Sequence, residues 1–454
     1  MKNRSPWLYQ LDQARVSKTL PGDLAADVAI IGAGIAGTAT AYFTLKYTDK
    51  RVVVLERFKM AHGATGHNAG QVTSYFERGF ASLAEEFGLD MAARGQRAVE
   101  DAWALLDEMY TDAGLDIPFS RFEGHAGFTS ETQVLLHLKN NHRRQEAGLP
   151  LERMRISETA AFLSAIPAEY KGLYEVVPHQ KVLALLESEA PEYVAALSYQ
   201  KGCINSALLC QEVFAYLLKT YPDRLALYEH APVHKLILRD ADALLDAGTH
   251  TVTADRVVLC TNGFEDFTII NEHGLEVNGR FHAGLSGHIG YMSGYLEKLN
   301  KPPVAISYFP QSGASAGEVY FYLTRRPYEY EAHPGHNLIS IGGPEAALPE
   351  RGAYSYEQEF PEEYVQAIDD FLRKTYDSDP NKKIEYIFTW HGLMGYTKNG
   401  VRMVGPEPQN PVLLYNLGCN GIGILPSACG GRIIARHLAG EKVEPSIFDV
   451  PKKG

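Results

Sequence analysis

The stretch DVAIIGAGIAGTATAYFTLKYTDKRVVVLE, residues 27–56, decides the fold of this chain. Two apolar runs predict buried parallel strands: Val28–Ile31 and Val52–Leu55. Between them lie three glycines in the spacing GxGxxG, followed by a segment compatible with a helix: Gly32, Gly34 and Gly37. A lone GxGxxG is a weak signal, but here an acid, Glu56, also ends the second run 19 residues after Gly37. The complete order therefore predicts a dinucleotide-binding unit.

Each small residue of this turn has a physical role in such a site. Gly32 permits a tight turn, Gly34 lets backbone N–H groups approach a pyrophosphate, and Gly37 lets the helix pack closely on the strand. Glu56 can accept a hydrogen bond from a ribose 2′-OH. The expected cofactor contacts of this unit are Gly32, Ala33, Gly34, Ile35, Ala36, Gly37, Glu56 and Arg57. The alternative, a glycine-rich turn without a ligand, would make the second strand and its acid a coincidence.

The composition is that of a globular enzyme. The chain has 454 residues, 45% of them apolar, which suffices for a large core and more than one domain. A net charge of −12 argues against a nucleic-acid or anionic-membrane surface. Five cysteines, an odd number with no CxxC pair, fit reduced thiols better than a disulfide framework. We expect a soluble, cytoplasmic protein with no metal site and with neither nucleic acid nor membrane as a partner.

Periodicity predicts the remaining elements in outline. Expected helices are Phe80–Tyr110, Glu131–Ala147, Ile156–Ser164, Gln211–Leu218, Pro361–Tyr376 and about Ser427–Leu438. Expected strands are Phe119–Phe128, Leu225–Glu229, Val233–Leu238, Thr251–Ala254, Arg256–Cys260, Arg280–Tyr295 and Glu318–Thr324. The Tyr-, Pro- and His-rich stretch Arg325–Asn337 is expected to be a loop.

Two further segments are rich in small residues. The segment 63–71, GATGHNAGQ, would let backbone pass close to a flat ring system, while Thr65, Asn68 and Gln71 supply donors and acceptors. A flexible loop without a ligand is the alternative for it. The segment 418–424, GCNGIGI, lies just ahead of a predicted helix, where backbone N–H groups can face an anion or a carbonyl. One cofactor held by both ends of the chain would explain this layout.

These blocks, in this order, resemble the FAD-dependent amine and amino-acid oxidoreductases of the D-amino-acid oxidase superfamily, which includes glycine oxidase, sarcosine oxidase and dehydrogenase, and γ-glutamylputrescine oxidase. The blocks are residues 28–37 with Glu56-Arg57, 63–72, 257–263, and 390–405 with 418–423. The resemblance covers nearly the whole chain and implies FAD, not NAD. It also implies an α/β fold. A Rossmann-like FAD-binding domain (20–110, 200–270 and 386–454) would accompany an α+β substrate domain (111–199 and 271–385) built on an antiparallel sheet.

The resemblance extends the expected FAD site and leaves the mode of attachment open. The further contacts are Ala64, Thr65, Gly66, His67, Asn68, Ala69, Gly70, Gln71, Val233, Thr261, Asn262, Gly263, Gly395, Gly421, Ile422, Gly423 and Ile424. In dimethylglycine and sarcosine dehydrogenases of this superfamily a histidine matching His67 carries the flavin covalently, whereas many relatives have arginine there. Because Gly66 replaces the tryptophan of the covalent pattern, we prefer noncovalent FAD, with a bond through His67 as the alternative.

The implied reaction is oxidation of the C–N bond of a small amine or amino acid to an imine by hydride transfer to flavin N5. Oxygen, giving hydrogen peroxide, or another acceptor would reoxidise the flavin. Met394 stands where glycine and D-amino-acid oxidases have the arginine that grips the substrate carboxylate, and methionine cannot form that pair. The departure favours an amine, a secondary amine or a γ-glutamyl amine. Arg280, Arg325 or Arg326 could replace the clamp, or they could be solvated surface residues. Asn399 replaces an aspartate that many relatives have.

The catalytic candidates are not anchored by any motif. Tyr320 and Tyr322 could wall the substrate site or pack in a strand, and His288 could act in catalysis or be structural. Lys298 and Lys301 are candidates for promoting the reaction with oxygen. Two other classes stay open, namely the flavin subunit of a heteromeric amine or sarcosine dehydrogenase complex and a protein with a structural flavin. Otherwise we expect a monomer or a homo-oligomer.

Overall fold

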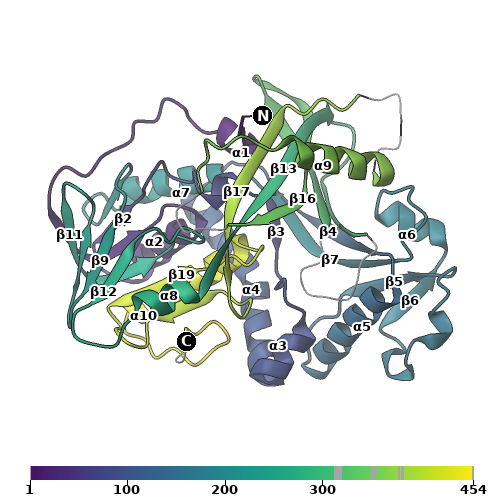
Figure 1. Ribbon diagram of the computed structural model, residues 1–454, viewed down its shortest axis with the longest axis horizontal. Coiled ribbons are helices and arrows are strands. Elements are labelled where there is room, and N and C mark those ends of the chain that lie inside the picture. The colour runs from purple at the N-terminus through teal and green to yellow at the C-terminus, as the bar shows by residue number, and fades with distance from the viewer. Residues whose placement is uncertain (1, 311–319, 349–353, 377–378, 380–382, 452–454) are drawn as a thin grey trace.

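The computed structural model describes residues 2–310, 320–348, 354–376, 379 and 383–451. Two large sheets organise these residues (Figure 1). The first sheet comprises β1 (Leu24–Ile31), β2 (Val52–Leu55), β8 (Leu225–Tyr228), β9 (Lys235–Leu238), β10 (Ala243–Asp246), β11 (Thr251–Leu259), β12 (Thr268–Asn271), β18 (Met403–Pro406) and β19 (Leu413–Leu417). Its parallel centre runs β8-β2-β1-β11-β19, so the carboxyl ends of these strands meet at one edge.

The strands of this centre are mainly apolar because both faces of the sheet are covered. All four residues of β2 are buried, as are the last four of β1. Helices α2 (Ile35–Tyr47) and α10 (Ile424–Leu438) pack against each other beside the sheet. A Cβ on Gly431 would stand 2.7 Å from the Ala39 carbonyl carbon, so glycine allows the two helices to approach closely. A helix from near the start of the chain and one from near its end therefore meet beside the first sheet.

The second sheet is mostly antiparallel, in the order β17-β13-β16-β15-β14-β4-β7-β5-β6, with β3 paired to β7. Its strands are β3 (Gln71–Thr73), β4 (Phe119–Phe128), β5 (Arg153–Ser157), β6 (Tyr174–Val177), β7 (Ala195–Ile204), β13 (Leu285–Lys298), β14 (Val304–Phe309), β15 (Phe321–Tyr330), β16 (His333–Ala347) and β17 (Phe388–Thr397). Two of its pairs are parallel, β14 with β4 and β5 with β6. The predicted fold class is confirmed: a Rossmann-like α/β unit accompanies an α+β unit built on a mainly antiparallel sheet.

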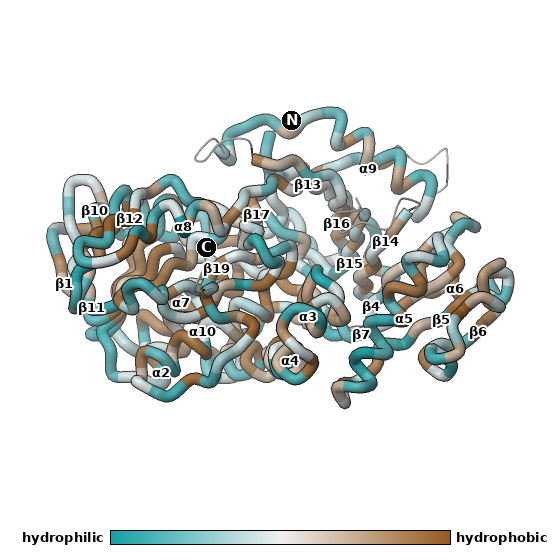
Figure 2. Tube along the Cα trace, turned by 60° about the horizontal axis from the view of Figure 1, so that its bottom comes forward, coloured by the Kyte–Doolittle hydropathy of each residue, from teal (hydrophilic) through white to brown (hydrophobic). Residues whose placement is uncertain are grey.

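The other helices surround the two sheets. They are α1 (Pro6–Tyr9), α3 (Phe80–Phe87), α4 (Leu89–Ala113), α5 (Glu131–Glu146), α6 (His179–Leu185), α7 (Ser206–Thr220), α8 (Asn278–Ala283) and α9 (Glu362–Thr375), with the short 3₁₀ turns η1 (Ala64–Gly66), η2 (Leu163–Ala165) and η3 (Ala168–Tyr170). In Figure 2 hydrophobic colouring follows α10 and strands of both sheets, and hydrophilic colouring follows many outer turns. No helix of the described residues combines the length and apolar character needed to cross a bilayer.

The predicted domain boundaries stay a prediction, and the two sheets do not follow them strictly. Strands β3 and β17 lie within the ranges assigned to the FAD domain, yet both pair into the second sheet. The chain first enters the second sheet at β3 and leaves it for the last time after β17. Both strands also carry parts of the glycine-rich blocks, which brings those blocks to the junction between the sheets.

Five predictions of local structure were wrong or incomplete. The expected loop Arg325–Asn337 belongs to the hairpin of β15 and β16, whose turn residues, Glu331 and Ala332, adopt positive φ angles without a typical turn sequence. The expected helix Ile156–Ser164 is instead the end of β5 followed by turns, and the Ser157 hydroxyl accepts from the Thr159 N–H. The expected strand Arg280–Tyr295 begins only at Leu285, after α8.

The helix expected at Phe80–Tyr110 is interrupted. Gly88 has φ +81° and separates α3 from α4. The predicted strands Thr251–Ala254 and Arg256–Cys260 are, by contrast, one strand, β11, whose first half pairs with β10 and whose second half pairs with β19. Of the predicted strand Glu318–Thr324, residues 318–319 lie outside the described residues.

Candidate functional site

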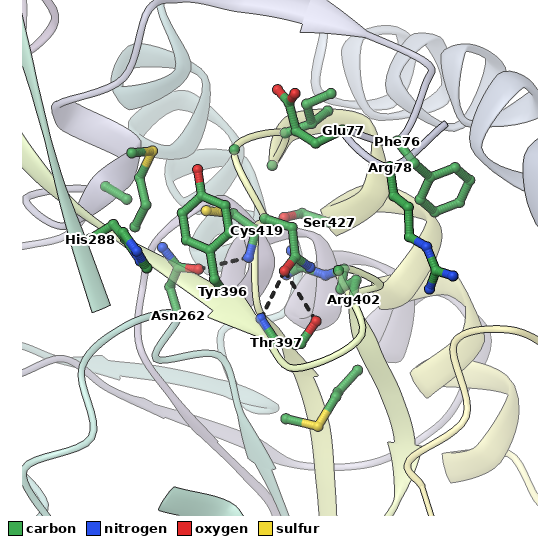
Figure 3. Close-up of a pocket in the computed structure, with 18 of the residues that line it drawn as sticks. Phe76, Glu77, Arg78, Asn262, His288, Tyr396, Thr397, Arg402, Cys419 and Ser427 are labelled. Atoms are coloured by element: carbon green, nitrogen blue, oxygen red, sulfur yellow. Dashed lines mark hydrogen bonds between the residues drawn. The ribbon is translucent and has the colours of Figure 1, made fainter. Parts of the chain in front are cut away.

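A cavity of about 1890 Å³ runs between the two sheets. It is lined at one end by the glycine turn after β1 and at the other by side chains of the second sheet, including Tyr322 and Glu345. Pockets for a single small molecule usually measure about 300–1000 Å³, so this cavity has room for a dinucleotide together with a small substrate. Figure 3 shows a part of its wall.

The glycine turn leaves no space for side chains. Gly32 has φ +103°, and a Cβ at Gly37 would lie 1.9 Å from the Gly32 carbonyl oxygen. A Cβ at Gly34 would lie 2.8 Å from the Thr65 Oγ1, which accepts a hydrogen bond from the Ile35 N–H. Helix α2 therefore begins immediately against the turn, and its N-cap, Gly34, has no side chain to cover the first N–H groups.

Glu56 is buried at the carboxyl end of β2 and bonds to the turn itself. Its Oε2 accepts from the Ala33 N–H at 2.8 Å, and its Oε1 accepts from the Phe58 N–H at 3.0 Å. Burial raises the pKa of this carboxyl, and the two backbone N–H groups oppose that rise. Because each carboxylate oxygen can accept more than one hydrogen bond, Glu56 keeps capacity for a ribose hydroxyl.

The neighbouring contacts predicted for the cofactor also line the cavity. Arg57 forms a bidentate pair with Asp266 at 2.6 and 2.8 Å and lies over the ring of Phe264. Val233 and Thr261 line the same cavity. The Thr261 Oγ1 is buried without a hydrogen-bond partner among the described residues, so it can form a hydrogen bond with a ligand.

The segment 63–71 forms the turn η1 and then enters β3. Asn68 holds it in shape, because its Nδ2 donates to the Thr65 carbonyl and to the Ser206 Oγ while its Oδ1 accepts from the Gly70 N–H. The glycines of this segment are required because residues near the N-terminus pack closely against it. A Cβ on Gly66 would meet Leu8 at 2.5 Å, and one on Gly70 would meet Trp7 at 2.7 Å. The other predicted cofactor contacts in this segment are Ala64, Ala69 and Gln71.

His67 is buried, neutral and fixed. Its Nδ1 donates to the Gly63 carbonyl at 2.9 Å, which leaves Nε2 as the acceptor nitrogen. Its ring stacks on Tyr356 with centroids 4.5 Å apart. Desolvation lowers the pKa of His67 to about 3, so the imidazole carries no charge at neutral pH. His67 lines the cavity and lies against Gly392 of β17.

The C-terminal glycine segment contacts the same region from the other side. A Cβ on Gly395 would stand 2.7 Å from the Asn262 carbonyl carbon, and one on Gly263 would stand 2.8 Å from the Met394 oxygen. The Asn262 Oδ1 accepts from the Cys419 N–H at 2.9 Å. Residues Gly421, Ile422, Gly423 and Ile424 then lead into α10, whose N-cap also lacks a capping side chain. Thr261, Asn262 and the segment 419–424 thus line one part of the cavity, and Figure 3 shows Asn262 beside Cys419.

The predicted substrate candidates separate into two groups. Tyr320, Tyr322 and His288 line the cavity, and the rings of His288 and Tyr396 contact each other in an edge arrangement with centroids 4.7 Å apart. Lys298 and Lys301 do not line it. Lys298 is exposed at the end of β13, and Lys301 is exposed beside the ring of Tyr376.

None of the three arginines proposed as a carboxylate clamp is available for that role. Arg325 is buried in a bidentate pair with Glu187, and Arg280 pairs with Glu407. Arg326 is buried over the ring of Trp7, outside the cavity lining. Met394, in contrast, lines the cavity. Asn399 acts in loop geometry, because its Oδ1 accepts from the Val401 N–H.

Several site residues had no sequence signal that would have revealed them. Glu77, Glu345 and Tyr396 line the cavity, from the loop after β3, from β16 and from β17. Lys201 of β7 is fully buried beneath the wall, where its Nζ donates to the Ser307 Oγ at 3.1 Å and to the Gln71 Oε1 at 3.4 Å. Desolvation lowers the pKa of Lys201 to about 7.

The residues present fit a flavin dinucleotide. Two helices, α2 and α10, begin at glycine N-caps that have no side chain and lie on the same cavity, which suits a pyrophosphate and a polar ring edge. The turn of Gly32–Gly37 has the close packing that a phosphate-binding turn requires, and the Thr261 hydroxyl has no partner of its own among the described residues. Among those same residues, no group of three or more His, Cys, Asp or Glu side chains could hold a metal ion.

Comparison with known proteins agrees with this reading. A family model described as FAD dependent oxidoreductase matches residues 27–437. The chain is 20% identical over 425 residues to the Probable oxidoreductase OrdL of Haemophilus influenzae, covering 93% of this chain and 85% of that protein. Its fold is similar to glycine oxidase from Geobacillus kaustophilus, with TM-score 0.64, 16% identity, and coverage of 94% of this chain and 99% of that one. L-proline dehydrogenase from P. horikoshii gives TM-score 0.64, 14% identity, and coverage of 95% and 97%.

Proposed function

Because the chain belongs to the family of FAD dependent oxidoreductases, we propose that it oxidises the C–N bond of a small amine or amino acid to an imine. The cofactor is FAD. The observation that carries the proposal is the single cavity, which continues from the dinucleotide turn at Gly32 to the aromatic wall at Tyr322. Such continuity lets one site hold both the cofactor and a small molecule.

The residues of the first sheet and of the chain termini would bind FAD. The N-terminus of α2, whose N-cap is a glycine, suits the pyrophosphate, and Glu56 suits the ribose. The segments around His67, Gly395 and Gly421 would enclose the ring system. When bound, FAD supplies the acceptor for the hydride that leaves the substrate carbon.

The protein's own contribution is orientation and exclusion of water. The tyrosines of β15 and β17 form an apolar wall with polar tips, so an amine can be positioned and partly desolvated there. The neutral His67 adds no positive charge that would repel a protonated amine. Water released into the cavity after oxidation can hydrolyse the imine to a carbonyl compound and a free amine.

The test is anaerobic reduction of the purified holoprotein. Sarcosine, glycine, proline, putrescine and γ-glutamylputrescine are mixed with it, and loss of the flavin band at roughly 450 nm is followed. Bleaching by at least one of them is expected. Reduction by dithionite but by no amine would refute the proposal, since the flavin would then be present without this reactivity.

Stopped-flow mixing of the substrate-reduced protein with oxygen would then separate an oxidase from a dehydrogenase. The noncovalent attachment of FAD, the cytoplasmic location and the state as monomer or homo-oligomer stay predictions from the sequence.

A further inference from the structure

The substrate end of the cavity is both acidic and aromatic. We use the name acidic pocket for the side chains of Glu77, Tyr320, Tyr322, Glu345 and Tyr396, all of which line the cavity. The Tyr320 hydroxyl donates to the Glu77 Oε1 at 2.9 Å, and the Tyr396 hydroxyl lowers the pKa of Glu345. The ring centroids of Tyr320 and Tyr322 lie 5.6 Å apart. A phenol group thus interacts with each carboxyl group.

The acidic pocket adjoins the segments that would enclose the flavin ring. A Cβ built on Gly421 would stand 3.0 Å from the Glu77 Cγ, so Glu77 touches the glycine segment before α10. Glu345 pairs in register with Gly290 of β13, and a Cβ on Gly290 would stand 3.0 Å from the Met394 Cε. Glu345 of β16 and Met394 of β17 therefore lie on the two strands that flank β13, at the place where a substrate would reach the cofactor.

Neither carboxylate is in an ion pair. Glu77 and Glu345 form no ion pair with any lysine or arginine in the described part of the chain, and both are exposed residues that line the cavity. Desolvation and repulsion from Glu77 raise the pKa of Glu345 to about 7. Lys201 is close enough to interact with Glu77 electrostatically, but it is fully buried and hydrogen-bonded to Ser307.

Most of the other basic residues on the cavity wall are already paired. The pairs are Arg57 with Asp266, Arg78 with Glu86, Lys139 with Glu85, Arg144 with Glu100 and Arg280 with Glu407. Figure 3 shows the Arg78 side chain turned away from Glu77 and Tyr396. Arg402 is held by Asn416, and Lys398 lies exposed in the turn after β17. Among the described residues, Lys201 is thus the one basic side chain that interacts with the acidic pocket, and it forms no ion pair there, so a cationic ligand can still pair with the two acids.

A substrate carboxylate would meet two acids here and no arginine, because Met394 replaces the usual clamp. A cation would instead bind favourably, since carboxylates attract it and tyrosine faces stabilise it. We propose that the acidic pocket binds the second, non-reacting ammonium group of a diamine substrate, between Glu77 and Glu345. This inference rests on the proposed oxidation of amines and names the substrate class for it.

The test compares three ligands of equal chain length that differ only in charge at the far end: 1,4-diaminobutane, 1-aminobutane and 4-aminobutanoate. Binding is measured by calorimetry on dithionite-reduced holoprotein under anaerobic conditions, where no substrate can be oxidised. We expect 1,4-diaminobutane to bind at least about tenfold more tightly than 1-aminobutane and 4-aminobutanoate to bind most weakly. Equal or tighter binding of 4-aminobutanoate would overturn the inference.

Variants then assign the effect to the two acids. Glu77→Gln and Glu345→Gln should each weaken 1,4-diaminobutane by about 10- to 100-fold and leave 1-aminobutane nearly unchanged. Glu85→Gln is the matched control, because Glu85 lines the same cavity but is paired with Lys139. Unchanged diamine affinity in both pocket variants contradicts the inference. The three-ligand series on the unsubstituted protein tests the diamine inference even where a variant fails to fold.

The two proposals can fail separately. If dithionite bleaches the oxidised flavin but no amine does, the proposed reaction is wrong, while the order of binding to the reduced protein still reports on the acidic pocket. If amines bleach the flavin but those bearing a carboxylate bind best, the reaction stands and the diamine assignment is wrong.

Discussion

Replacement of Lys201 by methionine should stabilise this protein at neutral and acidic pH. The side chain is fully buried on β7. Its ammonium group has hydrogen bonds to the Ser307 Oγ at 3.1 Å and the Gln71 Oε1 at 3.4 Å but no ion pair with a carboxylate of the described residues. Burial therefore lowers its pKa from the ordinary 10.5 to about 7. The protein keeps a charge in its interior that methionine, of similar volume, would not have.

The size and sign of the effect follow from proton linkage. Between pH 7 and 10.5 the unfolded chain binds the Lys201 proton and the folded protein has lost it, so stability rises with pH in this window, by about 1.4 kcal/mol per pH unit. Below pH 7 the full cost of about 5 kcal/mol applies. Loss of two hydrogen bonds, about 1 kcal/mol each, offsets part of the gain. We expect Lys201→Met to be about 3 kcal/mol more stable at pH 6 and less stable than the parent near pH 10.5.

The measurement is pulse proteolysis after equilibration in urea, at several pH values from 6 to 10, on the holoprotein. Lys298→Met serves as the control, because Lys298 is exposed at the end of β13 and its replacement should leave stability nearly constant. The informative quantity is the slope with pH of the difference between Lys201→Met and the parent. If the difference in free energy of unfolding stays constant from pH 7 to 10, the pKa of Lys201 is not lowered by burial and the prediction is refuted.

Three further results are expected. Gly37→Ala should abolish FAD retention, since its Cβ would lie 1.9 Å from the Gly32 oxygen, whereas Gly22→Ala, with nothing within 4 Å, should keep full flavin absorbance per protein. Acid precipitation should release all the flavin into the supernatant, and a yellow pellet would instead indicate a bond through His67. Affinity for 1,4-diaminobutane should fall from pH 8 to pH 6, because Glu345, with a pKa of about 7, loses its charge and Lys201 gains one, and calorimetry on Glu345→Gln should show a weaker dependence.

The dinucleotide unit was predictable because its physics is local in the chain. Strand, turn, helix and second strand follow one another within residues 27–56, and the closest contact, from Gly37 to the Gly32 oxygen, joins residues five positions apart. The residue type at this one position decides such a contact, because only glycine fits. The fold class followed from this unit and from the family resemblance, which also located the C-terminal glycines opposite it.

The acidic pocket was not predictable by the same means. Glu77 lies in a loop after β3, and Glu345 lies on β16, so only the completed second sheet brings them to one cavity. A single glutamate in a loop or a strand has no pattern that distinguishes it from a surface charge. The arginine candidates failed for the converse reason. Arg325 has the right chemistry for a carboxylate, but Glu187, which is distant in sequence, already occupies it.

Glu56 shows how a motif can identify the right residue while omitting part of its role. The sequence assigned this acid to the ribose, yet its two oxygens accept the N–H groups of Ala33 and Phe58 without any ligand. The Ala33 bond joins the end of β2 to the turn after β1, so the carboxylate shapes the phosphate-binding turn before the cofactor arrives. A ribose hydroxyl then meets an acceptor that is already oriented, which lowers the entropic cost of binding. The acid is therefore needed at that strand end for the geometry of the turn as well as for recognition of the sugar.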